Sequence, residues 1–128
     1  MMRFMAHGWI TARIVHITSQ TAWDCALVDG CYEPSSLKTE GYIHCATPWQ
    51  TVHIANTMFA DRKDLILLVI DPRKVDAEVV FENGNGRMEP FPHLYGPLPL
   101  EAVESVWPLR WLSERASYEF PKGWDLSR

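Results

Sequence analysis

Apolar and polar positions divide the first part of the chain into a strand, a helix and a loop. The β-branched run over residues 12–17 predicts a strand. Apolar residues at helical spacing follow it, so residues 20–28 are predicted to form a short amphipathic helix. Thr18 and Ser19 stand where a capping side chain is expected. Residues 31–40 show no apolar period and are expected to form a loop.

A second strand and helix follow, and this helix has the clearest start in the chain. Residues 41–45 are expected to form a short strand. Thr47 then offers a capping hydroxyl, Pro48 suits the first helical turn, and Gln50 stands where it completes a capping box. We expect this helix to run to about Phe59. Its buried side chains are expected to be those of Trp49, Val52, Ala55 and Phe59.

The second half of the chain predicts strands only. Residues 65–71 are apolar without alternation, which indicates a central strand buried on both faces. Further strands are expected over residues 78–82 and 102–109. A turn at 83–86 and a proline-rich segment at 90–99 separate them. Helices early and strands late predict an α+β domain rather than a regularly alternating parallel fold.

Length and composition indicate one folded domain. The chain has 128 residues, of which 47% are hydrophobic and 22% charged. These values are typical of a globular domain, since domains cluster around roughly 100 to 150 residues. We expect an N-terminal extension over residues 1–11, a single domain over 12–112 and a C-terminal segment over 113–128.

The charge pattern argues against nucleic acid as a partner. The formal net charge is −4, and the longest basic cluster, Arg62-Lys63, is flanked by Asp61 and Asp64. A protein that neutralises phosphates needs a cluster of lysine and arginine. Nucleic acid is therefore not an expected partner. The expected partner, a small-molecule ligand, follows from the candidate site residues, and the sequence does not indicate an oligomeric state.

No segment predicts export or insertion into a membrane. The longest apolar run, at residues 65–70, is far shorter than the roughly 20 residues that a spanning helix needs. The first residues contain no apolar run of signal-peptide length. Cys25, Cys31 and Cys45 form an odd set without CxxC spacing, which favours reduced thiols over disulfides or zinc. These features predict a cytoplasmic protein without a membrane partner.

Histidine is the side chain that points most directly to chemistry, because its ordinary pKa lies nearest neutrality. His16 and His44 each lie in a predicted strand just ahead of a predicted helix start, where backbone N–H groups favour an anionic group. The two could converge on one cleft if their strands are neighbours. His93 lies in the proline-rich segment near Tyr95 and could line a binding wall. The structural alternatives are a core histidine for His16 and a cover over the core for His93.

Metal binding and thiol chemistry are weaker interpretations of the same residues. Three histidines form an open zinc set in some enzymes, but this chain has no HxH or HxxxH spacing, so we expect no metal site. Cys45 follows His44 directly, and neighbours on a strand point to opposite faces, so a buried small hydrophobe is the default for this cysteine. His7 and His53 are interpreted as solvated or half-packed.

Three motifs carry a resemblance to a known family. They are Ile14-Val-His-Ile-Thr18, Glu40-Gly-Tyr-Ile-His-Cys-Ala-Thr47 and Phe91-Pro-His-Leu-Tyr-Gly-Pro-Leu98. With these motifs the chain resembles, over roughly residues 12–108, the bacterial family called domain of unknown function 952. The family label names no reaction.

That family looks like a member of the ADP-ribosyltransferase-like group. The resemblance implies a split, mostly antiparallel sheet with two helices alongside and NAD bound in a cleft between the halves. His16 matches the first motif of the group, and His44 lies where the second motif belongs. For the third motif, commonly a glutamate, this chain offers His93 or Tyr95, with Glu82 as an outside candidate.

The resulting hypothesis is a cleft that holds NAD, as substrate, or an ADP-ribose-like nucleotide. His16, His44 and His93 are its catalytic candidates, with transferase or glycohydrolase chemistry at a glycosidic bond. One alternative is a non-catalytic module that binds a small metabolite or a protein. The other is a metal-dependent hydrolase that uses the three histidines. The expected ligand-binding residues are Thr18, Tyr32, Tyr42, Thr47 and Tyr95.

Overall fold

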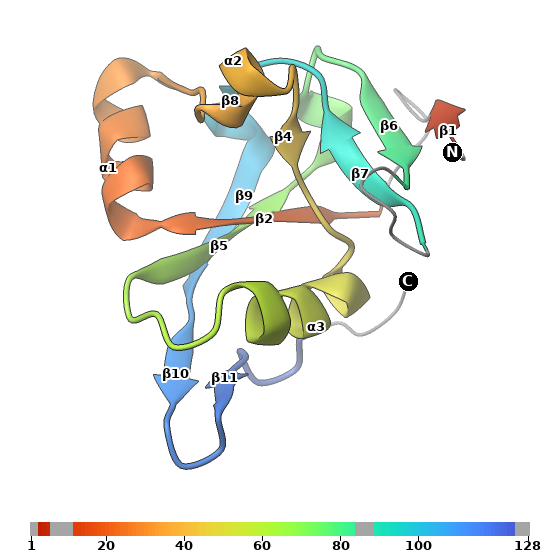
Figure 1. Ribbon diagram of the computed structural model, residues 1–128. Helices are drawn as coiled ribbons and strands as arrows, with labels where there is room; N and C mark the ends of the chain where they lie inside the picture. The colour runs from red at the N-terminus through yellow and green to blue at the C-terminus, as the bar shows by residue number, and fades with distance from the viewer. Residues whose placement is uncertain (1–2, 6–11, 84–88, 125–128) are drawn as a thin grey trace.

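The computed structural model describes residues 3–5, 12–83 and 89–124, and every strand pairing among them is antiparallel (Figure 1). One sheet has three strands in the order β2 (Ile14–Ser19), β5 (Leu65–Ile70) and β9 (Val103–Pro108). The central position expected for residues 65–71 is therefore confirmed. β2 is an edge strand of this sheet.

The second sheet contains part of the proline-rich segment, residues 91–94. Its strand order is β1 (Arg3–Met5), β6 (Val79–Glu82), β7 (Phe91–Leu94) and β4 (Ile43–His44). A proline-rich segment does not predict a strand, because proline lacks the N–H of a strand ladder. Pro92 still contributes its carbonyl, which accepts a hydrogen bond from the Cys45 N–H at 3.0 Å.

The two longer helices begin where their caps predict. Ser19 accepts a hydrogen bond from the Ala22 N–H and starts α1 (Gln20–Asp29), which ends at Gly30 in the left-handed conformation. The full capping box of Thr47 and Gln50 starts α3 (Pro48–Met58).

The face that α3 buries agrees with the prediction only in part. Ala55 is buried as expected, Val52 and Phe59 are partly buried, and Trp49 is 42% exposed. Gln50 and Thr51 are buried as well. Burial of the two polar side chains is possible because both are hydrogen-bonded. The Gln50 amide donates to the carbonyl of Pro90, and the Thr51 hydroxyl donates to that of Thr47.

Several short elements lie where the sequence predicted none. The expected loop at 31–40 contains β3 (Cys31–Tyr32) and a third helix, α2 (Ser36–Thr39). These elements span less than two helical turns, so an apolar period cannot reveal them. The other unpredicted elements are β8 (Leu98–Pro99), which pairs with β3, the hairpin of β10 (Arg110–Leu112) and β11 (Ser117–Glu119), and the 3-10 turns η1 (Pro72–Lys74) and η2 (Leu100–Ala102).

Two predictions concern residues outside the described part of the chain. The turn expected at 83–86 falls mainly on residues 84–88, and His7 also lies outside the described residues. β1 lies within the segment interpreted as an extension and pairs with β6.

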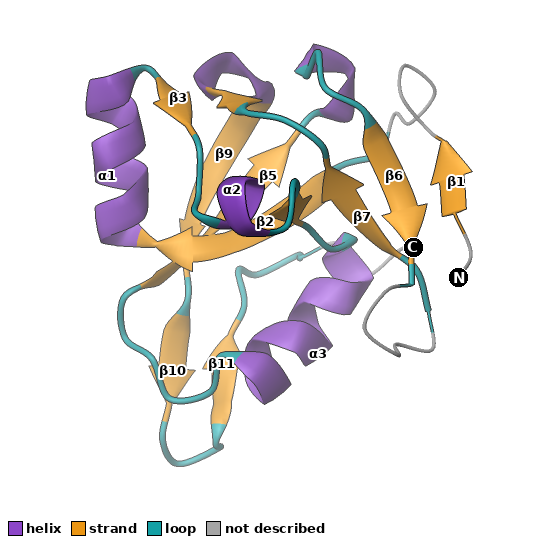
Figure 2. Cartoon of the chain, turned by 45° about the horizontal axis from the view of Figure 1, so that its top comes forward, coloured by secondary structure: helices purple, strands orange, loops and turns teal. Residues whose placement is uncertain are grey.

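Both faces of β5 are buried because apolar groups cover each of them. Leu65 and Leu67 pack with Ala55 of α3 and Tyr118 of the C-terminal hairpin. Ile66, Leu68 and Ile70 belong to a second cluster that includes Trp23 and Ala26 of α1. Figure 2 shows α3 beside the β10–β11 hairpin and away from α1. No helix among the described residues is long and apolar enough to span a membrane.

One isolated bridge joins the two larger sheets. The N–H of Val15 donates to the carbonyl of Ala46 at 2.8 Å, and the N–H of Ala46 donates back to Val15 at 2.8 Å. The chain that leaves β4 therefore attaches to the outer edge of β2. This attachment brings the histidines of the two strands together.

Candidate functional site

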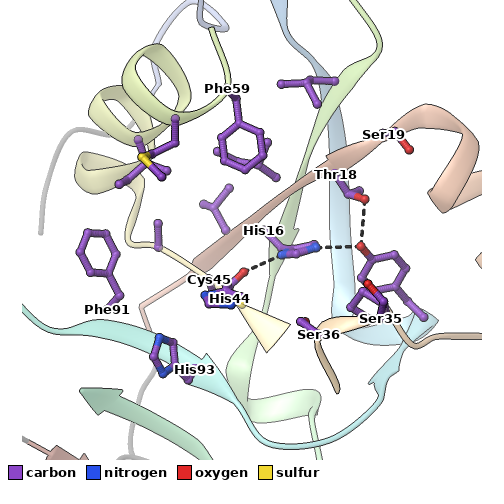
Figure 3. Close-up of a pocket in the computed structure, with 18 of the residues that line it drawn as sticks. His16, Thr18, Ser19, Ser35, Ser36, His44, Cys45, Phe59, Phe91 and His93 are labelled. Atoms are coloured by element: carbon purple, nitrogen blue, oxygen red, sulfur yellow. Dashed lines mark hydrogen bonds between the residues drawn. The ribbon is translucent and has the colours of Figure 1, made fainter. Parts of the chain in front are cut away.

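A cavity of about 600 Å³ lies at the free edge of β2, beside the junction of the two sheets. His16, His44 and His93 all line it (Figure 3). Thr18 and Tyr32 line it as well. The structure therefore brings the three candidate histidines to a single cavity, whose volume is typical of a small-molecule site.

His16 is the centre of a hydrogen-bonded chain. Its Nδ1 lies 2.6 Å from the carbonyl oxygen of His44, and its Nε2 lies 2.7 Å from the Tyr32 hydroxyl (Figure 3). The Tyr32 and Thr18 hydroxyls are 2.9 Å apart. A carbonyl can only accept, so Nδ1 carries the proton. Burial lowers the pKa of His16 to about 4, so at neutral pH Nε2 accepts from Tyr32, and Thr18 in turn donates to Tyr32.

The arrangement gives His16 a positioning role. Both of its ring nitrogens are engaged with the protein, so neither is free to transfer a proton to or from a ligand. Burial also raises the pKa of Tyr32, which keeps its hydroxyl protonated at neutral pH. The chain of hydrogen bonds fixes the strand that carries His44 against β2.

Glu82 and His93 form a buried carboxylate–histidine pair. His93 donates through Nδ1 to Oε1 of Glu82 at 2.7 Å, and the side chains are 8% and 5% exposed. The Tyr95 hydroxyl donates to the same carboxylate oxygen. Burial lowers the pKa of His93 although the Glu82 carboxylate acts to raise it. The three residues considered for the third motif are thus joined in one cluster.

The tautomer that Glu82 selects leaves one ring nitrogen of His93 able to accept a proton. Because Nδ1 is the donor, Nε2 carries the lone pair, and among the described residues Nε2 has no hydrogen-bond partner. The Tyr42 ring stacks on His93 with centroids 4.0 Å apart and an interplanar angle of 13°. The carboxylate and the stacked ring together fix the imidazole in position, as in hydrolases whose histidine is oriented by a carboxylate.

A second carboxylate–histidine pair lies next to the first. His44 Nε2 is 2.5 Å from Oε2 of Glu40, and both side chains are partly exposed. His44 and His93 are direct partners across β4 and β7, and their ring centroids are 5.5 Å apart. Glu40 was not among the sequence candidates, although its position four residues before His44 is a spacing at which the two side chains can meet.

The other end of the cavity is apolar with one cation. Phe59 and Phe91 point into the cavity (Figure 3). The cation is Arg62, which forms a two-point ion pair with Asp64 at 3.2 and 2.9 Å. Phe91 belongs to the third family motif, on β7. Phe59 and Arg62 were not candidates for a site, because they reach the cavity only when α3 packs on β2.

The C-terminal hairpin supports this apolar end. The Tyr118 hydroxyl donates to the carbonyl of Phe59 and accepts a hydrogen bond from the N–H of Arg62 at 3.0 Å. The N–H of Tyr118 also donates to the Asn56 side chain at 2.7 Å. The hairpin thereby holds the turn after α3, from which two cavity residues come.

Three predicted ligand-binding residues do not line the cavity. Thr47 uses its hydroxyl as the cap of α3, where it accepts from the Gln50 N–H. Tyr42 and Tyr95 lie behind the cavity and contact His93 or its partner Glu82.

Thiolate and metal chemistry find little support in the geometry. Burial raises the pKa of the Cys45 thiol to about 12, so at neutral pH it is not a nucleophile. No three His, Cys, Asp or Glu side chains among the described residues are grouped closely enough to hold a metal ion. His16 in particular has no nitrogen to offer, because both are in protein hydrogen bonds.

Comparison with known proteins gives a family and a fold. The model of the family "Protein of unknown function (DUF952)" matches residues 17–106. The crystal structure of protein CC0527 from Caulobacter crescentus is 26% identical, covers 84% of this chain and 94% of its own, and superposes with a TM-score of 0.74. The solution NMR structure of the same protein is 27% identical, covers 80% and 88%, and has a TM-score of 0.63. No curated protein matches. The chain therefore belongs to the DUF952 family of proteins of unknown function.

Proposed function

We propose that the cavity binds NAD or an ADP-ribose-like nucleotide and that the protein acts on a glycosidic bond of its ribose, as a transferase or glycohydrolase. The observation that carries this proposal is the buried Glu82–His93 pair at a cavity of about 600 Å³. Within the described part of the chain, Nε2 of His93 has no hydrogen-bond partner. The antiparallel sheets with flanking helices are compatible with an ADP-ribosyltransferase-like fold, which the proposal includes.

The distribution of charge supports one orientation of such a ligand. Cleavage of a ribosyl bond develops positive charge on the sugar, and Glu82 supplies a carboxylate behind His93 to stabilise it. Along β2 the cavity runs from His16 to Ser19, which lies opposite Leu65 in the strand register. The N-terminus of α1 and the Arg62 guanidinium lie at that far end, and both favour phosphate groups.

The backbone of β2 offers a further contact. Val15 uses both its N–H and its C=O at the outer edge of the strand, towards Ala46. Ile17, two residues further on, lines the cavity and presents its N–H and C=O to the same edge. A donor and an acceptor side by side suit an amide group, such as the carboxamide of a nicotinamide ring. Phe59 and Phe91 suit stacking on a base.

Calorimetry with NAD and with ADP-ribose tests the proposal. We expect binding to the native protein and a loss of at least tenfold in affinity for His93→Ala and His44→Ala. His16→Ala tests the positioning role and is compared with Tyr32→Phe, because the alanine variant creates a buried void. His53→Ala is the matched control, since His53 is exposed on α3 and does not line the cavity. Absence of binding at millimolar ligand would overturn the proposal.

A binding module without turnover is the second candidate. It is favoured by His16, whose two nitrogens are both engaged, and by Cys45, whose thiol stays protonated. Ligand stabilisation in a thermal-shift experiment with no product by mass spectrometry supports this candidate. Release of nicotinamide or free ADP-ribose excludes it.

A further inference from the structure

We propose that the cavity hydrolyses an O-glycosidic bond of an ADP-ribose-like ligand, with His93 as the base that activates water and His44 as the acid that protonates the departing oxygen. This inference rests on the proposed function and names its substrate class, a riboside whose leaving group must take up a proton. The pyridinium bond of NAD differs, because nicotinamide departs as a neutral molecule and needs no acid.

The first support is that the site contains two carboxylate–histidine pairs. Glu82 lies 2.7 Å from Nδ1 of His93, and Glu40 lies 2.5 Å from Nε2 of His44. Each carboxylate accepts from one ring nitrogen and leaves the other nitrogen available. Among the described residues neither Nε2 of His93 nor Nδ1 of His44 has a hydrogen-bond partner. One base is sufficient to activate water, so the second pair is surplus unless the reaction also needs an acid.

The second support is the arrangement of the two rings. His44 and His93 stand directly opposite each other on β4 and β7, where paired side chains share one face of the sheet. Their centroids are 5.5 Å apart, and both residues line the cavity. A single bond between a sugar carbon and an oxygen can lie within reach of both rings.

The third support is that the environments of the two histidines differ. His93 is 6% exposed, and its burial favours the neutral form that a base requires. The His44 side chain is 48% exposed and lies against the Glu40 carboxylate. An acid and a base in unlike surroundings are the usual requirement of glycoside hydrolysis.

The sign of the charge selects glycosidic over phosphoryl chemistry. Glu82 lines the histidine end of the cavity, and Glu40 pairs with His44 without lining it. The one arginine that lines the cavity within the described residues is Arg62, beyond α3. Phosphoryl transfer concentrates negative charge and needs cations around it. An oxocarbenium-like sugar is positive and is stabilised by the Glu82 carboxylate, which lines the cavity. The backbone edge at Ile17 accepts any amide and therefore does not select nicotinamide.

The reaction balances without a further reagent. The oxygen of water forms a bond to the anomeric carbon while the bond to the leaving oxygen breaks, and that oxygen keeps the electron pair. Nε2 of His93 takes the proton from water, and Nδ1 of protonated His44 gives a proton to the leaving oxygen. The products are ADP-ribose and an alcohol. Solvent returns one proton to His44 and removes one from His93.

The test compares leaving groups on the full chain. The substrates are the 1″-O-methyl and 1″-O-(4-nitrophenyl) glycosides of ADP-ribose, with release of ADP-ribose followed by chromatography. We expect His44→Asn to lower kcat on the methyl glycoside by about 10²- to 10⁴-fold, the range typical of a lost general acid. The nitrophenyl glycoside needs little protonation and should lose less than about fivefold. Glu40→Gln should also lower kcat selectively on the methyl glycoside, by a smaller factor than His44→Asn.

The controls and contrary outcomes separate this inference from the proposed function. His93→Asn should slow both glycosides about equally, and His53→Asn, outside the cavity, should change neither. Equal loss on both glycosides with His44→Asn would overturn the role of His44. Binding of ADP-ribose with no cleavage of either glycoside would overturn the inference and leave the proposed function standing. Failure to bind ADP-ribose at all would overturn both.

Discussion

The Tyr32 hydroxyl lies 2.7 Å from Nε2 of His16 and connects two buried residues that are 16 positions apart in the chain. Through Thr18 on one side and the carbonyl of His44 on the other, this contact extends into a polar chain. Its members come from β2, β3 and β4, which belong to three different sheets. The chain of hydrogen bonds therefore fixes the relative position of sheets that share few backbone contacts.

Tyr32→Phe should destabilise the fold, because it leaves Nε2 of His16 buried without a donor. We expect the free energy of unfolding to fall by about 1–3 kcal/mol, the usual cost of an unsatisfied buried polar group. Urea denaturation measures the change. Tyr42→Phe is the matched control, since the Tyr42 hydroxyl makes no hydrogen bond among the described residues and its ring stacking on His93 is retained. A change of equal size in both variants would contradict the assignment.

His16 should make the fold less stable at mildly acidic pH. Its pKa is about 4 in the folded state, against an ordinary value near 6.5, so the unfolded chain binds a proton that the folded chain excludes. The contribution of His16 to the free energy of unfolding should therefore be fully present above about pH 6.5. It should be lost as the pH drops to 4, which lowers the free energy of unfolding by ~3 kcal/mol in total. The lowered pKa of His93 acts in the same direction.

Denaturation at several pH values between 7 and 4 measures this effect, and His16→Gln supplies the comparison. Without the imidazole, the variant should lose most of the slope in that window. Asp71 does not interfere, because its hydrogen bond with Arg73 lowers its pKa to about 2. Its contribution to the free energy of unfolding therefore changes mainly below about pH 4. Identical slopes for the native protein and the variant would show that His16 is not the titrating group.

Glu82→Gln should shift the titration of His93. The Glu82 carboxylate raises the pKa of His93 against the larger effect of burial. A neutral amide removes that support, so the pKa of His93 should fall further below its ordinary range. NMR titration of the imidazole Cε1–H signal follows it. Glu89→Gln, at an exposed carboxylate outside the pair, should leave the signal unchanged. A rise in the pKa of His93 would refute the pairing.

Tyr118→Phe should loosen the turn that follows α3. The variant loses the hydrogen bonds from the hydroxyl to Phe59 and from the Arg62 N–H, while the ring contact with Trp111 remains. We expect a loss of about 1–2 kcal/mol in stability. Hydrogen exchange at the Arg62 amide should accelerate more than exchange in β5, because the change is local. Uniform acceleration across the protein would instead indicate a purely global effect.

The elements that the sequence predicts correctly are those set by local interactions. The capping box of Thr47 and Gln50 and the central strand at 65–71 depend on neighbours in the chain or on a continuous apolar run. The elements it misses depend on distant partners. β3 and β8 pair through two residues each, and β7 contains Pro92, so neither propensity nor period marks them.

The candidate site follows the same division. His16 and His44 could be singled out because each lies in a predicted strand shortly before a helix, and the structure brings both to one cavity with His93. The carboxylates that pair with the histidines were harder to identify from the sequence. Glu82 meets His93 through the register of β6 and β7, where Val80 rather than Glu82 stands opposite His93. No spacing along the chain encodes such a diagonal contact, and the cavity itself depends on the Val15–Ala46 bridge.

Substitutions at Thr47 can distinguish a structural role of this residue from a ligand-binding role. The sequence predicts Thr47 both as a helix cap and as a ligand-binding residue. In the structure its hydroxyl accepts from the Gln50 N–H, and Thr47 does not line the cavity. Thr47→Ala should therefore lower the free energy of unfolding by about 1 kcal/mol, the usual cost of a lost cap. Affinity for ADP-ribose, measured by calorimetry at 15 °C where the variant remains folded, should stay within about twofold, because the cap supports α3 without contacting the ligand. Thr47→Ser, which keeps the capping oxygen, should recover most of the stability. A large loss of affinity with Thr47→Ser as well would instead assign Thr47 to the binding surface.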